Sequence, residues 1–154
     1  MPPPEQGPGN DADVAPIDPR ACLALLGSGG IGRVAVSIGA VPAVFPVHYA
    51  VLDGEVVFRT APGTGLHAAT RNAVVAFEVD EVDPEYREGW SVLVVGMASE
   101  ITDDARRARA DALPLRPWAP DSPEHVMAIR PELVSGRRIV PGDLGPEMGA
   151  FVSP

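Results

Sequence analysis

The sequence predicts a mainly β domain that folds as a closed or nearly closed antiparallel barrel. Short apolar runs follow one another closely, and tight turns rich in Gly, Pro and Asp join most of them. Only two or three short segments show a helical pattern. A doubly wound parallel sheet needs a helix between successive strands, so the close, hairpin-like spacing favours a barrel.

The two ends of the chain have compositions that do not support packed structure. Residues 1–16 contain five prolines as well as Gly7, Gly9 and Asn10. We expect this segment to be a solvated tail or an arm that lies on a neighbour. The barrel domain is expected to cover residues 17–140, and residues 141–154 are expected to form an irregular C-terminal tail.

The first expected element is a short helix at residues 19–26, with Pro19 in its first turn. The glycines of the next stretch, "GSGGIG" at residues 27–32, look like a phosphate-binding loop. A dinucleotide-binding fingerprint requires the order strand, glycines, helix, whereas here a helix comes first and a strand follows. We therefore interpret this stretch as a helix stop.

Three strands are expected next, at residues 32–38, 42–52 and 55–60. The second strand alternates well, so that one face carries Phe45, Val47, Tyr49 and Val51 and the other carries Val44, Pro46, His48 and Ala50. The Asp53-Gly54 pair between the second and third strands is a strong hairpin signal.

A short helix at residues 65–72 precedes two further strands, at residues 73–82 and 90–102. Gly96, inside the second of these, is expected at a bend or bulge.

A charged helix then follows the capping residues Thr102-Asp103-Asp104, and its arginines at 106, 107 and 109 are expected to face water. After a proline-rich crossing, residues 124–140 supply one or two closing strands, interrupted at Pro131.

Charge and hydropathy exclude several classes of function. The net charge is −9, and no basic stripe offsets it, so we expect no binding to nucleic acid or to anionic membranes. No apolar run approaches the roughly 20 residues needed to cross a bilayer. The N-terminal residues do not resemble a secretory signal, and a cytoplasmic location is the default expectation.

The cysteine and histidine content gives no support to metal chemistry. Cys22 is the only cysteine, which excludes an internal disulfide and a cysteine-based zinc site; we expect it to be buried and inert. His48, His67 and His125 are scattered without metal-ligand spacing, so no metal site is predicted.

The stretch "VVFRTAPGTGLHAAT", residues 56–70, brings a cation, hydroxyls and glycines to the start of a helix. One interpretation is a surface arginine at position 59 with a helix-capping threonine at 60 or 64. The other is an anion site, because Arg59, the two hydroxyls and helix amides converge there.

Five segments in this order resemble the pyridoxamine 5′-phosphate oxidase-like flavoproteins, the FMN-binding split barrels. The segments are "GRVAVS", "PAVFPVHYAVLDGEVVFRTAPGT", "VAFEVDEVD", "GWSVLVVGMASEIT" and "SGRRIV", and they span roughly residues 20 to 140. The resemblance implies a six-stranded antiparallel split β-barrel that pairs into a homodimer, with two flavin sites at the subunit interface.

The resemblance also implies roles for individual residues. Arg59 would contact the phosphate of FMN, Thr60 and Thr64 would supply hydroxyls, and Gly63 would supply a close-lying amide. The strand that runs along the isoalloxazine ring corresponds to Pro46, Val47, His48 and Tyr49. Trp90 and Ser91 begin the strand that supplies further ring or ribityl contacts.

One position departs from the family pattern. Relatives usually have a lysine or arginine where this chain has Gly65. Losing one charge-assisted hydrogen bond to a phosphate costs on the order of 1.5–3 kcal/mol, or roughly ten- to hundredfold in affinity. FMN would then bind weakly, unless His67 compensates, or the site would hold another ligand or none.

Three side chains in this pattern have an alternative interpretation. His48 is either a packed, hydrogen-bonded core residue or a flavin neighbour. Trp90 either stacks on a ring or fills the end of the barrel. Tyr49 is more simply explained by packing.

The resulting functional prediction is a flavin-dependent oxidoreductase that acts on a small molecule. The cofactor performs the redox chemistry in such proteins, so no catalytic side chain is predicted. The alternative is a non-catalytic protein that binds or stores a flavin, a deazaflavin or haem on the same fold. A third interpretation is a dimeric scaffold whose pocket has decayed.

Overall fold

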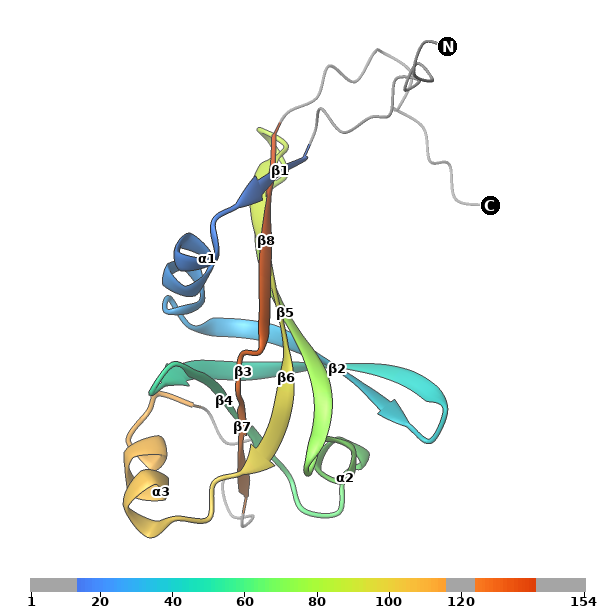
Figure 1. Cartoon of the computed structure of the whole chain (residues 1–154), viewed down its shortest axis with the longest axis vertical. Helices are drawn as coiled ribbons and strands as arrows, with labels where there is room; N and C mark the ends of the chain where they lie inside the picture. Colours follow the sequence, from blue (N-terminus) through green and yellow to red (C-terminus); the bar gives the residue numbers. More distant parts are fainter. Residues whose placement is uncertain (1–13, 116–123, 141–154) are drawn as a thin grey trace, which may run out of the picture.

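The structure, a computed structural model, describes residues 14–115 and 124–140 (Figure 1). Its elements, in chain order, are β1 (Val14–Ile17), α1 (Pro19–Leu26), β2 (Gly30–Ile38), β3 (Val41–Leu52), β4 (Glu55–Thr60), α2 (Gly65–Thr70), β5 (Ala73–Asp83), β6 (Glu88–Glu100), α3 (Asp104–Asp111), β7 (His125–Ile129) and β8 (Leu133–Ile139). No helix in the described ranges is long and apolar enough to span a bilayer.

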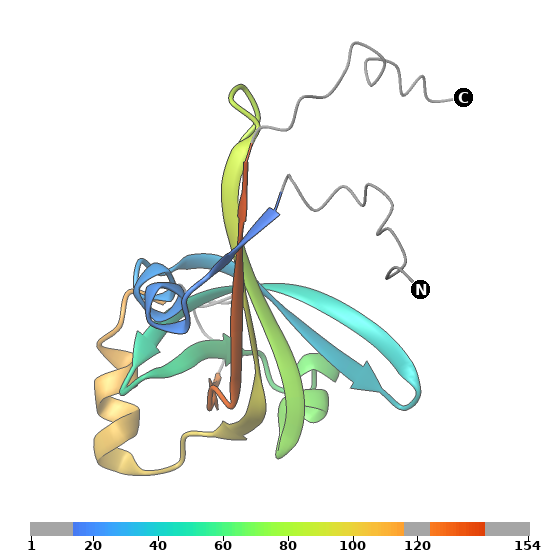
Figure 2. The ribbon, with the colours of Figure 1, turned by 45° about the horizontal axis from the view of Figure 1, so that its top comes forward.

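Six antiparallel strands close into a barrel. Neighbouring strands follow the order β6-β5-β2-β3-β4-β7, and β7 pairs back onto β6 to complete the ring. The predicted six-stranded antiparallel barrel is therefore confirmed. Outside the ring, β8 pairs with β6 and β1 pairs with β8, and together with the β5–β6 hairpin they rise above the barrel (Figure 2).

Most predicted elements form where the sequence placed them. β4 has the predicted bounds, and β3 differs by one residue. Between them, Asp53 and Gly54 both have positive φ, 53° and 76°, as a tight hairpin turn of the Asp-Gly type requires. The glycines after α1 also act as predicted, because the helix ends at Leu26 and β2 begins at Gly30.

The predicted N-terminal tail is wrong at its last residues. Val14–Ile17 forms β1, which pairs with β8 and reaches into the segment expected to lack packed structure. Pro16 is tolerated because β1 is the outermost strand, where a missing N–H costs no ladder bond on its open side. The remaining tail residues 1–13, the crossing at 116–123 and the C-terminal tail at 141–154 lie outside the described residues.

Gly96 does not form the expected bulge. The β5–β6 register runs unbroken through the Val75–Gly96 pair. A Cβ on Gly96 would lie 1.7 Å from the carbonyl oxygen of Arg130, so only glycine fits there. At this point β6 changes partner, pairing with β8 up to Val95 and with β7 from Ala98.

Two apolar cores stabilise the fold. The larger fills the barrel and continues under α1, where Cys22 is fully buried as predicted. Burial raises the pKa of the Cys22 thiol, which keeps it inert. The smaller core lies between α3 and the outer face of β4 and β7, and it includes Val57, Ala110 and Val126.

Ion pairs fasten α3 to the β3–β4 hairpin. Arg109 donates two hydrogen bonds to the Asp53 carboxylate, at 2.9 and 2.7 Å, and Arg106 pairs with Glu55. The hydrogen bonds from Arg109 hold the pKa of Asp53 below its usual value. The α3 arginines, predicted only to face water, thus also position the helix.

Replacing Gly96 with alanine tests the close approach at the strand switch. Because the new methyl group would collide with backbone rather than with a movable side chain, we expect Gly96→Ala to lower the free energy of unfolding by at least about 2 kcal/mol. Urea denaturation measures the change. Gly65→Ala is the control, because its Cβ would meet only Ile38 Cδ1 at 3.4 Å; we expect a change within about 0.5 kcal/mol. Equal losses of unfolding free energy in the two variants would contradict the conclusion that the strand switch requires glycine at position 96.

Candidate functional site

The turn between β4 and α2 is built by local hydrogen bonds. Thr64 is the N-cap of α2: its hydroxyl accepts from the His67 backbone N–H at 3.3 Å and donates to the Ala61 carbonyl at 2.7 Å. Gly63 has φ +74° and nothing within 4 Å of a virtual Cβ, so its backbone is openly accessible. The capping interpretation of Thr64 is thus confirmed, and Gly63 is left as the open part of the turn.

Arg59 is held between two carboxylates on the α3 side of the sheet. Its terminal nitrogens lie 3.4 Å from Asp111 and 3.4 Å from Glu124. The Arg59 side chain is 15% exposed and that of Glu124 only 3%. Arg107 joins the same network through Asp111 and the Glu124 carbonyl. Arg59 therefore has a structural role, and only its buried Nε lacks a hydrogen-bond partner among the described residues.

Thr60 points the other way. It is 1% exposed, shares the inner face of β4 with Phe58, and lies opposite His125 in the β4–β7 ladder. Its hydroxyl oxygen is buried without a hydrogen-bond partner in the described part of the chain. The expected convergence of the Arg59 guanidinium and the Thr60 hydroxyl on one anion is therefore not present in this structure.

The predicted ring-binding strand, β3, presents two different faces. Val47 and Tyr49 are buried in the barrel; the Tyr49 hydroxyl donates to the Leu26 carbonyl at 3.1 Å and its ring meets Phe77 edge-on at 4.7 Å. Tyr49 is thus a packing residue, and a ligand could contact Val47 and Tyr49 only through their backbone.

Pro46 and His48 lie on the outer face of β3, where His48 is half-buried, so the interpretation that packs His48 inside the barrel does not hold. His48 shares this face with Ala50, whose cross-strand partner Val57 shares the face of Arg59. The two predicted flavin contacts His48 and Arg59 therefore lie on the same face of the sheet.

Trp90 and Ser91 lie near the start of β6, at the other end of that strand from its junction with β7. Trp90 is near the start of β6 and lines an open pocket with Glu81, Glu88 and Arg138 beside the β5–β6 hairpin. Glu100, at the other end of β6, is ten residues away, which corresponds to about 30 Å along the strand. One chain does not bring Trp90 together with Arg59.

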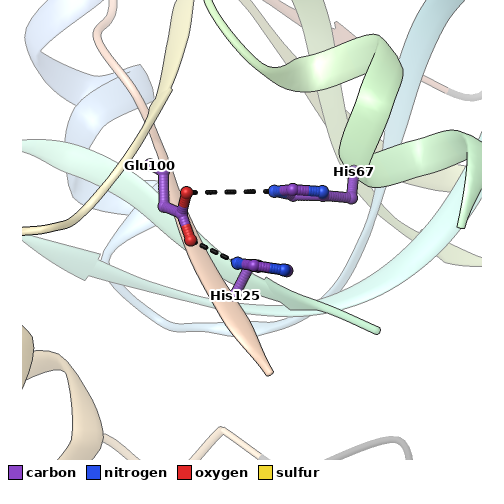
Figure 3. A group of neighbouring side chains, drawn as sticks. All are labelled: His67, Glu100 and His125. Atoms are coloured by element: carbon purple, nitrogen blue, oxygen red, sulfur yellow. Dashed lines mark hydrogen bonds and ion pairs between the residues drawn. The ribbon is translucent and has the colours of Figure 1, made fainter. Parts of the chain in front are cut away.

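His67, Glu100 and His125 form a cluster that was not predicted from the sequence (Figure 3). The two imidazole rings stack with centroids 3.8 Å apart and planes 9° from parallel. His125 Nδ1 is hydrogen-bonded to Glu100, and His67 Nε2 lies 3.9 Å from the other carboxylate oxygen. The three residues come from α2, the end of β6 and the start of β7, so no local spacing could reveal them.

The environment of this cluster shifts two of its pKa values. Burial, followed by the nearby His125, lowers the pKa of His67 and favours its neutral imidazole. The hydrogen bond with His125 lowers the pKa of Glu100 and keeps it ionised. At neutral pH the cluster thus contains a carboxylate and an imidazole with a free electron pair.

Comparisons with known proteins agree with the barrel. The family model for pyridoxamine 5′-phosphate oxidase matches residues 18–138. The uncharacterised protein Rv0080 of Mycobacterium tuberculosis is 40% identical over 138 residues, which cover 86% of this chain and 90% of that protein.

Two solved structures are similar in sequence and in fold. The FAD binding protein from Mycobacterium smegmatis is 35% identical, with a TM-score of 0.75, over 83% of this chain and 100% of that chain. The protein of unknown function DIP1874 from Corynebacterium diphtheriae is 32% identical, with a TM-score of 0.71, over 83% of this chain and 99% of that chain.

The burial of the Arg59–Glu124 pair predicts a large effect on stability. We expect Arg59→Gln to lower the free energy of unfolding by about 1–3 kcal/mol, because it removes a cation that faces a nearly fully buried carboxylate. Arg33→Gln is the matched control: Arg33 lies at the same 3.4 Å from Glu78, but its side chain is 51% exposed, so the loss should stay below about 1 kcal/mol. Chemical denaturation compares them, and an equal or smaller loss for Arg59→Gln would contradict the structural role.

Proposed function

The chain belongs to the pyridoxamine 5′-phosphate oxidase-like family of FMN-binding split barrels, and from that premise we propose that it is a flavin-dependent oxidoreductase acting on a small molecule. The observation that carries the proposal is the similarity to the FAD binding protein from Mycobacterium smegmatis, at 35% identity over the whole of that chain. A bound flavin supplies the redox chemistry, and the protein binds it, orients it and excludes water.

The residues at the end of β4 support a site for the phosphate end of the flavin. The Arg59 side chain keeps 15% of its surface exposed, and Gly63, four residues further on, leaves its backbone open. In our proposal these two contact the phosphate, whereas Thr64 only shapes the turn. Thr60 is not part of the proposed phosphate site, because its side chain points to the inner face of the barrel.

The outer face of β3 is the proposed binding surface for the isoalloxazine ring. Pro46 and the His48 imidazole lie on the face that also carries Arg59, so one ligand can extend from the strand to the turn. In our proposal His48 donates or accepts a hydrogen bond at the ring or at a substrate. The buried Val47 and Tyr49 contribute backbone only.

Gly65 bears on which flavin binds and how it is used. The sequence resemblance predicts FMN, whereas the Mycobacterium smegmatis relative is an FAD binding protein. The missing cation at Gly65 weakens any contact that depends on a terminal phosphate dianion. This position also favours the second candidate, a protein that holds a flavin without catalysis.

We propose further that the protein is a homodimer with two shared flavin sites. An apolar row crosses five strands on their outer face, through the cross-strand neighbours Val44, Ala35, Ala76, Val95 and Leu133. Val44 and Leu133 are 62% and 69% exposed, which is costly unless a partner covers them. Trp90 and Ser91, about 30 Å from Glu100 along β6, would then contact the flavin of the other subunit.

Purification and spectroscopy test the flavin proposal. We expect a yellow protein that releases one flavin per chain on denaturation, with mass spectrometry identifying it as FMN or FAD. An enzyme should be bleached by a reduced nicotinamide donor and regain colour with an acceptor, whereas a storage protein should not. A colourless protein whose thermal midpoint ignores added FMN and FAD would overturn both versions.

A charge restored at position 65 tests the phosphate contact. Since Arg59 also stabilises the fold, we expect Gly65→Lys to be more informative than removal of Arg59. It should tighten FMN binding by roughly ten- to hundredfold, the value of one charge-assisted hydrogen bond. Gly65→Gln has similar length without the charge and should change affinity by less than about threefold. Equal FMN affinities for the two variants would contradict a phosphate contact at this turn.

The apolar row predicts the oligomeric state. We expect light scattering after size exclusion to give a dimer for the wild type and a monomer for Val44→Glu, which places a charge in the covered row. Leu23→Glu is the control, because Leu23 is an exposed apolar residue on α1, on the other face of β6 and β8. A Val44→Glu protein that remains dimeric would rule out this interface.

A further inference from the structure

The cluster of His67, Glu100 and His125 occupies the end of the barrel where the ring of strands closes. Glu100 is the last residue of β6 and pairs with Met127, while His125 is the first residue of β7 and pairs with Thr60. His67 reaches the same point from α2 (Figure 3). Three donor groups from three elements thus meet where β6 and β7 begin to pair.

Hydrogen bonding accounts for only part of this arrangement. The Glu100–His125 bond gives each of these side chains a partner. His67 Nε2, by contrast, is inaccessible to solvent and has no hydrogen-bond partner among the described residues, although a carboxylate oxygen lies 3.9 Å away. The hydroxyl of Thr60, on the inner face opposite His125, is also buried and has no hydrogen-bond partner among the described residues. Buried polar groups without a partner are costly, so two at one place indicate a missing ligand.

The donor atoms match the chemistry of a transition-metal site. One atom from each residue lies within 4.8 Å of the other two. In a tetrahedral zinc site with bonds of about 2.0–2.2 Å, ligand atoms lie about 3.3 Å apart, and the ion lies in the plane of each imidazole that binds it. The two stacked rings must therefore turn out of their parallel arrangement when the ion binds. Two imidazoles and one carboxylate form a donor set that zinc uses with a fourth position open, whereas Mg²⁺ and Ca²⁺ prefer oxygen ligands.

We propose that His67, Glu100 and His125 bind one divalent transition-metal ion, and that Zn²⁺ is the ion this donor set favours. His67 supplies Nε2 and Glu100 supplies a carboxylate oxygen. A water molecule in the fourth position gives the Thr60 hydroxyl its partner. The ion links α2 to the junction of β6 and β7 and so stabilises the closure of the barrel. This site is separate from the proposed flavin site, because the Thr60 and Arg59 side chains leave β4 on opposite faces.

Titration of the full-length chain tests the proposal. After EDTA treatment and exchange into metal-free buffer, calorimetry with ZnCl₂ should give one ion per chain, and Zn²⁺ should raise the thermal midpoint. Co²⁺ should give visible absorption bands typical of four- or five-coordination. A wild-type protein that binds no Zn²⁺, or whose thermal midpoint ignores it, would overturn the site in favour of a simple hydrogen-bonded cluster.

Variants distinguish the cluster from adventitious binding. His125→Ala and Glu100→Gln should each weaken Zn²⁺ binding at least tenfold. His48→Ala is the matched control, because it removes the one other histidine of the chain and should leave the Zn²⁺ affinity unchanged. Equal losses in His48→Ala and His125→Ala would mean that binding is unspecific and would overturn the proposal. If His125→Ala does not fold, the wild-type stoichiometry and Co²⁺ spectrum decide alone.

Discussion

The closure of the barrel depends on the close approach of two backbones at Gly96. At this residue β6 stops pairing with β8 and begins to pair with β7. The carbonyl of Arg130 occupies the space that a side chain at position 96 would need. If this passage were blocked, β7 could not reach β6, and the ring would remain an open sheet. Closure in turn fixes the end of β6 beside the start of β7. Both the buried Arg59–Glu124 pair and the histidine cluster are built at this junction.

The junction separates two faces that carry different chemistry. Alternation along β4 sends Arg59 to the outer face, towards α3, and Thr60 to the inner face, towards His125. The outer face also carries His48 and supports the proposed flavin site. The inner face carries the proposed metal site. Two neighbouring residues of one strand thus face the two separate proposed sites, although the stretch from Arg59 to Thr64 looks like a single anion site in the sequence.

The sequence predicted the barrel well, because hairpin turns and alternation are local signals. The Asp53-Gly54 turn and the β4 bounds are examples. Long-range geometry was not predictable: Gly96 is required by a backbone distant in sequence, and His67 meets His125 only after the barrel closes. The role of Arg59 was only partly predicted, since nothing near it in sequence indicates that Asp111 and Glu124 flank it. The composition of residues 14–16 predicted no packed structure, but these residues belong to an outermost strand, where a proline is accepted.

The attachment of α3 has a consequence for how the protein responds to its surroundings. This helix is fastened by guanidinium–carboxylate contacts at the surface as well as by the smaller apolar core, whereas α1 is fastened by buried apolar residues. Dissolved salt screens the first kind of contact within about 10 Å at 0.1 M and leaves the second largely untouched. Rising ionic strength therefore weakens the ion pairs that orient α3 and leaves the packing of α1 largely unchanged.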